Sequence, residues 1–190
     1  FSGSSLPIDF KIWDEINKQE DCKILQRRIG SIIESLESIG VMLDANDCSV
    51  MTVTRRTKNA ITNRYNIENM EITRKDFMHE GGVLFDNRLK FSSHIQQICK
   101  KGRQICSLII KNSTQFKKYE TEVALYNSLV KPHLEYASTI WASANNIELQ
   151  QLQQNFIYYL AKKYFPGENF QNAQYENLFK IEPLKFSAHH

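Results

Sequence analysis

Apolar residues recur at three- and four-residue steps in several stretches of the chain, and this spacing predicts amphipathic helices. One helix is predicted over residues 14–39, where Gly40 marks its end and the apolar stripe consists of Leu25, Ile29, Ile32, Ile33, Leu36 and Ile39. A second helix follows residue 88, with an apolar face formed by Ile95, Ile98, Gly102, Ile105 and Ile109. Further helices are predicted from Tyr119 onward, along the face Leu149, Leu152, Phe156 and Leu160, and over residues 174–179.

Alternating apolar and polar residues predict strands between the first two helices. Residues 50–56 alternate in this way, and residues 63–72 are predicted to pair with them as a hairpin. A second hairpin is predicted over residues 78–86, because its adjacent Gly81 and Gly82 suit a tight turn or a bulge. The expected fold class is therefore α+β, a small antiparallel sheet with a packed helix, followed by a helical part. Tyr136 and Trp141 are expected in the core of that helical part.

Charge is distributed unevenly along the chain. An apolar content of 42% and a charged content of 24% are those of an ordinary folded protein. Residues 55–118 contain 14 Lys or Arg but five Asp or Glu, and the stretch between Asp86 and Glu120 has no acidic residue. Such segregation indicates either a surface that faces a polyanion, of which nucleic acid is the commonest, or the solvated side of a hairpin and a helix. The candidate nucleic-acid contacts are Arg55, Arg56, Lys58, Arg64, Lys100, Lys101, Arg103 and Lys111.

Other chemical motifs do not emerge from the sequence. The four cysteines, Cys22, Cys48, Cys99 and Cys106, have no Cys-x-x-Cys spacing and are expected to be buried thiols. The histidines lack the spacing of a zinc site, and the sequence has neither a phosphate-binding glycine loop nor a nucleophile motif. We therefore expect no metal, cofactor or catalytic residue. The chain also lacks an 18-residue apolar run, so we expect no membrane segment.

Several ordered motifs carry a resemblance to a known family. They are Gly-Val-x-Phe-Asp at 82–86, Leu-x-Phe-x-x-His-Ile at 89–95, Leu-Tyr-x-Ser-Leu-Val-x-Pro-x-Leu-Glu-Tyr-Ala-Ser at 125–138, and Trp141. In this order and spacing, the sequence resembles the C-terminal part of the reverse transcriptases of jockey-like non-LTR retrotransposons, over residues 6–186. The resemblance implies an incomplete palm domain at 6–92, which includes the primer-grip region, and a helical thumb at 93–190.

The same alignment places degenerate residues where the family carries its catalytic motif. Leu6, Pro7, Ile8 and Asp9 stand at the aromatic-Ala-Asp-Asp positions, and Asp47 replaces a lysine that the family places near the leaving pyrophosphate. A polymerase needs the first aspartate as an oxygen ligand for Mg²⁺, which an isoleucine cannot supply. An aspartate near the pyrophosphate repels it. These two departures predict that the chain is not an enzyme.

The leading hypothesis is a catalytically inactive, domesticated or decayed reverse-transcriptase derivative that binds duplex nucleic acid or RNA through the basic thumb helix and hairpin. The alternative is a protein-interaction module built on the exposed palm surface, where a homodimer or another protein covers the sheet that lacks its upstream strands. A third hypothesis is a fragment of a longer RNA-directed DNA polymerase. An intracellular location, nuclear or cytoplasmic, is expected, although the sequence is also compatible with secretion.

Overall fold

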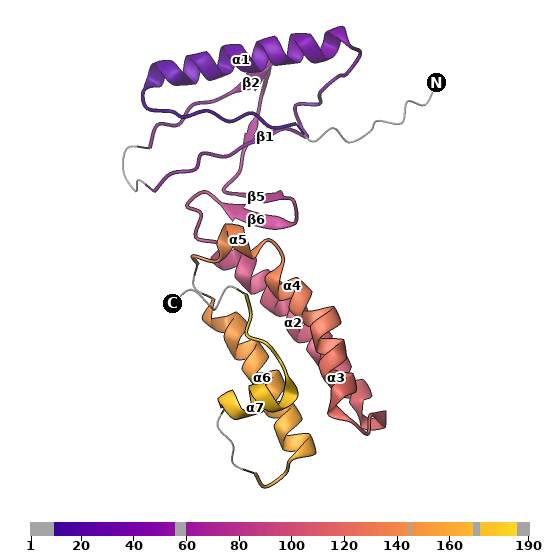
Figure 1. Ribbon diagram of the computed structural model, residues 1–190. Coiled ribbons are helices and arrows are strands. Elements are labelled where there is room, and N and C mark those ends of the chain that lie inside the picture. The colour runs from indigo at the N-terminus through magenta and orange to yellow at the C-terminus, as the bar shows by residue number, and fades with distance from the viewer. Residues whose placement is uncertain (1–9, 56–59, 145, 169–171, 186–190) are drawn as a thin grey trace. The chain divides into compact units, whose positions relative to one another are not determined.

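The computed structural model describes residues 10–55, 60–144, 146–168 and 172–185, and it confirms the α+β class (Figure 1). The chain divides into two compact units, residues 1–78 and residues 79–190. The boundary between the two units, after residue 78, lies near the start of the hairpin over residues 77–86. The sequence predicted a later boundary, between residues 92 and 93. The two units are therefore described one at a time.

The first unit contains one long helix and short strands. Its elements are α1 (Gln19–Ser38), β1 (Ser49–Val50), β2 (Asn66–Ile67), β3 (Met70–Glu71) and β4 (Thr73–Arg74). The strands β5 (Phe77–Glu80) and β6 (Val83–Asp86) form the hairpin that leads into the second unit. The second unit continues with α2 (Ser92–Asn112), the 3-10 turn η1 (Ser113–Gln115), α3 (Tyr119–Leu125), the π-helical turn η2 (Tyr126–Val130), α4 (Lys131–Glu135), α5 (Ser138–Trp141), α6 (Ile147–Tyr164) and α7 (Asn172–Phe179).

Helix α1 begins five residues later than the sequence predicted. The carboxylate of Asp21 accepts hydrogen bonds of 2.9 Å from the backbone N–H groups of both Asn17 and Lys18. Lys18 is extended, with φ −147°, so a side chain three residues into the helix caps its start. The predicted start at residue 14 was wrong because apolar spacing does not reveal this cap. The predicted end before Gly40 is confirmed.

A small core holds the first unit together. Cys22 and Ile29 of α1 are buried against the segment that carries β2, β3 and β4, and the other buried members are Ala45, Tyr65, Ile67 and Ile72. The predicted apolar stripe is covered only in part, because Ile39 at its C-terminal end is 73% exposed. Ile39, the last member of the predicted stripe, therefore does not lie in the core.

The strand pairing in the first unit also differs from the predicted hairpin of 50–56 with 63–72. Strand β1 pairs in parallel with β4, and β2 and β3 form a tight hairpin of their own inside the predicted second strand. The side-chain amide of Gln26, on α1, explains the difference. It donates to the carbonyl oxygen of Asn66 and accepts from its N–H, both at 2.9 Å. Because α1 satisfies the backbone of Asn66 in this way, the residues after Val50 are not needed as its partner.

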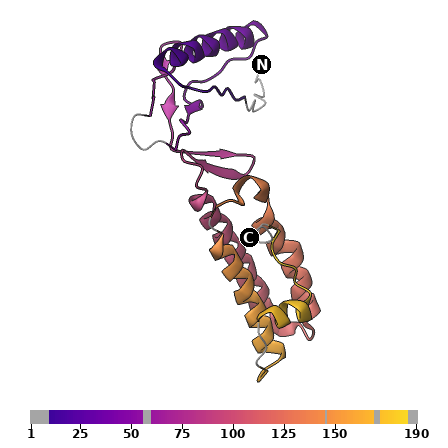
Figure 2. The same ribbon diagram turned by 60° about the vertical axis from the view of Figure 1, so that its left-hand side comes forward.

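Three helical segments lie side by side in the second unit: α2, the continuous segment from α3 to α4, and α6 (Figure 1 and Figure 2). Gly102 of α2 sits where they meet. A Cβ atom at this position would lie 2.9 Å from Leu134 Cδ2 and 3.0 Å from Leu152 Cδ1. The absence of a side chain at Gly102 therefore lets α4 and α6 approach α2 closely. Helix α7 packs on α3 and α6, where its Phe179 is buried.

The middle helical segment widens for one turn before a proline. The N–H of Lys131 donates to the carbonyl of Tyr126, five residues earlier, which is π-helical spacing. Pro132 follows directly, and it has no N–H to donate to the residue four positions back. The wider turn accommodates the proline without ending the helical segment, and it keeps Tyr126 and Val130 fully buried.

The β5–β6 hairpin is attached to the helices through its turn. Gly81 and Gly82 have φ values of 51° and 80°, in the left-handed region that glycine adopts easily. The Tyr136 hydroxyl donates to the carbonyl oxygen of Gly81 at 2.9 Å, and a Cβ on Gly82 would lie 3.2 Å from the tyrosine ring. Tyr136 is nevertheless 58% exposed, so its expected place in the core was wrong. Trp141 is fully buried, as expected.

Candidate functional site

A buried carboxylate organises the entry into α2. Asp86 Oδ2 accepts a hydrogen bond of 2.7 Å from the N–H of Phe91, and Oδ1 accepts one of 2.9 Å from the N–H of Arg88. Burial opposes ionisation of Asp86, but the backbone N–H groups of Lys90, Phe91 and Arg88 outweigh it and lower the pKa of this carboxyl. The ionised Asp86 therefore holds the loop that leads from β6 into α2.

The outer side of α2 is cationic. Ile95, Cys99, Gly102, Cys106 and Ile109 turn one side of the helix into the core. The opposite side is exposed and carries a shallow depression, lined by Lys100, Lys101, Arg103, Gln104, Ile105, Ser107, Leu108 and Lys111. We call these eight residues the α2 basic surface.

The cations of the α2 basic surface have few partners. Helix α2 contains no acidic residue. Lys100, Lys101 and Lys111 form no ion pair with any residue in the described part of the chain. Because a helix rises 1.5 Å per residue, these amines are spread over about 16 Å. Arg103 differs, because its Nη2 lies 3.2 Å from Oε2 of Glu148 on α6.

The second predicted cluster of cations is not part of this surface. Arg55 and Arg64 belong to the first unit, where both are exposed. Arg64 lies 3.5 Å from the carboxylate of Glu71 on β3. Arg56 and Lys58 lie outside the described residues. The structure therefore brings together four of the predicted cations on α2, whereas Arg55 and Arg64 belong to the other unit. The four are Lys100, Lys101, Arg103 and Lys111.

Of the degenerate catalytic positions, Asp47 lies in the described part of the chain. Leu6, Pro7, Ile8 and Asp9 lie outside the described residues. Asp47 is exposed in the turn that precedes β1, and its N–H donates to the carbonyl of Asp44 at 3.1 Å. Burial first, and then the carboxylates of Asp47 and Asp44, raise the pKa of the neighbouring Cys48 thiol. A negative field thus surrounds the position at which the family places a lysine.

Most of the cysteine thiols are buried. Cys22, Cys99 and Cys106 are buried free thiols, as predicted, whereas Cys48 is only partly buried. Burial raises the pKa of Cys99 to about 11 and that of Cys106 to about 12, so both thiols are protonated near neutral pH. Across residues 10–55, 60–144, 146–168 and 172–185, no group of three or more His, Cys, Asp or Glu side chains is placed to hold a metal ion.

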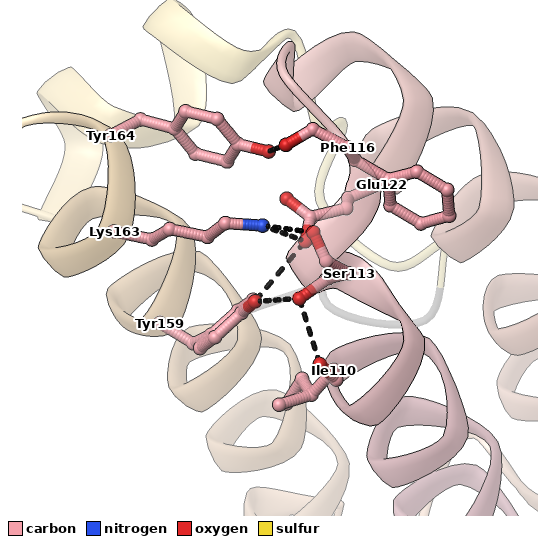
Figure 3. Close-up of polar contacts among 7 residues, drawn as sticks. All are labelled: Ile110, Ser113, Phe116, Glu122, Tyr159, Lys163 and Tyr164. Carbon is pink, nitrogen blue, oxygen red and sulfur yellow. Dashed lines mark hydrogen bonds and ion pairs between the residues drawn. The ribbon is translucent and has the colours of Figure 1, made fainter.

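A buried polar cluster joins α6 to the far end of α2 and to α3 (Figure 3). Glu122 is fully buried, and its Oε1 lies 2.9 Å from Lys163 Nζ and 3.1 Å from the Tyr159 hydroxyl. Lys163 also donates to the carbonyl of Ser113 at 2.8 Å, and Ser113 Oγ lies 2.5 Å from the Tyr159 hydroxyl. The Tyr164 hydroxyl donates to the Phe116 carbonyl at 3.4 Å.

The electrostatics of this cluster favour a charged Lys163. Partial burial would lower its pKa, but the hydrogen bonds to Glu122 and Tyr164 and the charge of Glu122 raise it above the usual value of 10.5. The amine also lies 4.8 Å from the centre of the Tyr164 ring, a cation–π distance. The sequence alone does not reveal this cluster, because Ser113, Glu122 and Lys163 come from three separate elements. Its atoms point at one another, which indicates a structural role.

His94 is another buried polar side chain near the start of α2. Its Nδ1 accepts a hydrogen bond of 3.3 Å from the N–H of Leu84, and its ring meets Trp141 edge to face at 5.9 Å. Burial, and to a smaller extent the charge of His79, lowers the pKa of His94 below 6.5. The ring is therefore neutral near pH 7, with its proton on Nε2, which suits a packing role rather than proton transfer.

No protein-family model, curated protein or solved structure matches this chain. Among the helices of the described residues, none combines the length and apolar character needed to cross a membrane. The site is therefore interpreted from its own residues, among which the unpaired lysines of the α2 basic surface are exposed.

Proposed function

We propose that this chain is a catalytically inactive derivative of a jockey-like reverse transcriptase, and that it binds duplex nucleic acid or RNA through the α2 basic surface. The observation that carries the proposal is the set of exposed lysines, Lys100, Lys101 and Lys111, which have no ion-pair partner among the described residues. Charges without an internal partner are available to a polyanion. The ordered motifs from Gly82 to Trp141 support the proposed ancestry.

Such a surface would recognise phosphates rather than bases. The residues that line it include no aromatic side chain on which a base could stack. Lysines act as point charges that neutralise phosphates whatever the sequence of the nucleic acid. Each neutralised phosphate releases counterions, so the affinity should fall steeply as the salt concentration rises.

The proposal predicts a salt-dependent affinity that two lysines control. The binding of a short RNA–DNA duplex is measured by fluorescence anisotropy between about 50 and 200 mM salt. In the Lys100→Ala/Lys101→Ala variant the affinity should fall, and the log–log salt slope should flatten by about two, since each lost phosphate contact removes roughly one unit.

A matched control separates the surface from net charge. Lys180→Ala/Lys185→Ala removes two exposed positive charges from the C-terminal segment, which follows α7. This variant should bind almost as the wild type does. Equal losses in both double variants would mean that net charge rather than the α2 basic surface governs binding. No binding by the wild type at low salt would overturn the proposal.

Lack of polymerase activity is part of the same proposal. It is supported by Ile8, which has no oxygen ligand for Mg²⁺, and by Asp47, whose exposed carboxylate takes the place of a cation. These two positions act on different parts of the reaction, the metal ions and the leaving pyrophosphate. Loss of either one would impair nucleotide transfer.

Exposed apolar side chains in the first unit favour a second candidate function, protein interaction. Trp13 is 90% exposed, Met42 is 88% exposed and Ile39 is 73% exposed. A contiguous exposed apolar patch is typical of a surface that another chain covers, and these three side chains are its candidate members. In this candidate function, the first unit forms a homodimer or binds another protein.

The homodimer form makes a direct prediction about mass in solution. Light scattering at increasing protein concentration should approach the mass of two chains. A Trp13→Ser/Met42→Ser variant should stay closer to the mass of one chain, because it removes two exposed apolar side chains. A wild type that keeps the mass of one chain throughout the range would contradict the homodimer.

A further inference from the structure

Arg103 is the one cation of the α2 basic surface that the described residues show in an ion pair. Its side chain lines the depression together with Lys100 and Lys111, yet its guanidinium reaches Glu148 at 3.2 Å. Glu148 lies in the first turn of α6 and is the single acidic residue in the α6 sequence. A carboxylate therefore stands at the edge of an otherwise cationic surface, next to the group best shaped to hold a phosphate.

The contact between Arg103 and Glu148 is of a kind that exchanges easily. A single nitrogen–oxygen contact joins the two side chains, whereas a forked arginine–carboxylate pair has two parallel bonds. Both side chains are accessible, with 58% of Arg103 and 46% of Glu148 exposed. Exposed pairs of this type are weak and are screened by salt. A phosphate can therefore replace the carboxylate without first exposing a buried charge.

We propose that Glu148 is a built-in competitor of phosphate for Arg103, and that nucleic acid binds the α2 basic surface with full strength only after this ion pair breaks. The inference rests on the proposed function and adds regulation to it. Glu148 would weaken binding and flatten the salt dependence, because a phosphate that Arg103 does not neutralise keeps its condensed counterions.

A rival explanation assigns Glu148 a purely local role. An acidic side chain in the first turn of a helix interacts favourably with the positive end of the helix dipole. In that case its charge would act on a bound polyanion only through general repulsion, whatever the residue at position 103. A test must therefore ask whether the effect of Glu148 depends on Arg103.

A double-mutant cycle answers this question. The probe is the same short RNA–DNA duplex, measured at low salt with the wild type, Glu148→Gln, Arg103→Ala and the double variant. Glu148→Gln should tighten binding about two- to fivefold, the range that corresponds to an exposed ion pair, and should steepen the salt slope by about 0.9. In the Arg103→Ala background the same substitution should leave the affinity unchanged.

Three outcomes are decisive. An equal gain from Glu148→Gln in both backgrounds would overturn the inference in favour of general repulsion, and no gain in either background would overturn it while leaving the proposed function intact. If neither the wild type nor Glu148→Gln binds the duplex, the proposed function fails as well. Glu120→Gln removes the same charge from an exposed position on α3 and should change the affinity little. Circular dichroism of each variant verifies that α6 is intact.

Discussion

Replacing Lys163 by methionine is expected to lower the free energy of unfolding by about 3–5 kcal/mol, the usual cost of breaking a buried ion pair from one side. Its partner Glu122 is fully buried, and one of its oxygens, Oε2, has no hydrogen-bond partner among the described residues even in the intact protein. Without the ammonium group, the Tyr159 hydroxyl is the hydrogen-bond donor that remains to the carboxylate within the described residues. The large expected loss therefore comes from a charge left alone away from water.

The experiment is urea unfolding followed by circular dichroism, with two comparison variants. Lys162→Met changes the neighbouring, exposed lysine and should alter stability by no more than about 0.5 kcal/mol. Glu122→Gln/Lys163→Met removes both charges and should lose much less than Lys163→Met alone, because no ion stays buried. If Lys163→Met were as stable as Lys162→Met, the assigned role of the cluster would be wrong.

Replacing Trp141 by alanine is the second change with a large expected effect, a loss of about 3–5 kcal/mol. The side chain is fully buried, its Nε1 donates to the carbonyl of Tyr136 at 3.0 Å, and its ring packs against His94. Truncation would leave a cavity between α5 and the start of α2. It would also remove the indole N–H that donates a hydrogen bond to the Tyr136 carbonyl oxygen.

The chain provides its own control for this prediction, because its other tryptophan is exposed. Trp13 is 90% accessible, so Trp13→Ala should change the free energy of unfolding by less than about 0.5 kcal/mol. Urea unfolding of the two variants gives the comparison. Similar losses of unfolding free energy in both variants would show that the size of the removed side chain, rather than its burial, determines the effect.

These two stability predictions bear on the α2 basic surface, although neither residue belongs to it. Trp141 packs at the N-terminal end of α2 and the Glu122–Lys163 cluster lies at its C-terminal end. The two groups therefore hold the ends of the helix whose middle turns carry Lys100 and Lys101. A cationic surface binds a polyanion more tightly when its charges are held in place before binding.

Local sequence patterns were enough for much of the second unit. The steps from Ile95 to Ile109 predicted the buried side of α2, and the row from Leu149 to Leu160 predicted that of α6. A helix turns its residues toward the core at a fixed interval, so sequence spacing translates directly into burial. The exposure of Lys100, Lys101 and Lys111 follows from the same periodicity.

Contacts between distant residues decided the rest. Spacing predicted a hairpin between residues 50–56 and 63–72. The Gln26 amide on α1, forty residues away, instead satisfies the backbone of Asn66, and β1 pairs with β4. Tyr136 is exposed because its hydroxyl reaches the Gly81 carbonyl, which no local pattern encodes. The same is true of Arg103, whose partner Glu148 is 45 residues away.

The sequence by itself thus determined where the long helices lie and which of their sides carry charge, because both depend on intervals of three or four residues along one element. Only the tertiary structure decided which charges are available to a ligand. Lys100, Lys101 and Lys111 stay unpaired within the described part of the chain, Arg103 is held by Glu148, and Lys163 is committed to Glu122. Ion pairs between separate helices depend on how those helices pack, and packing is a property of the whole fold.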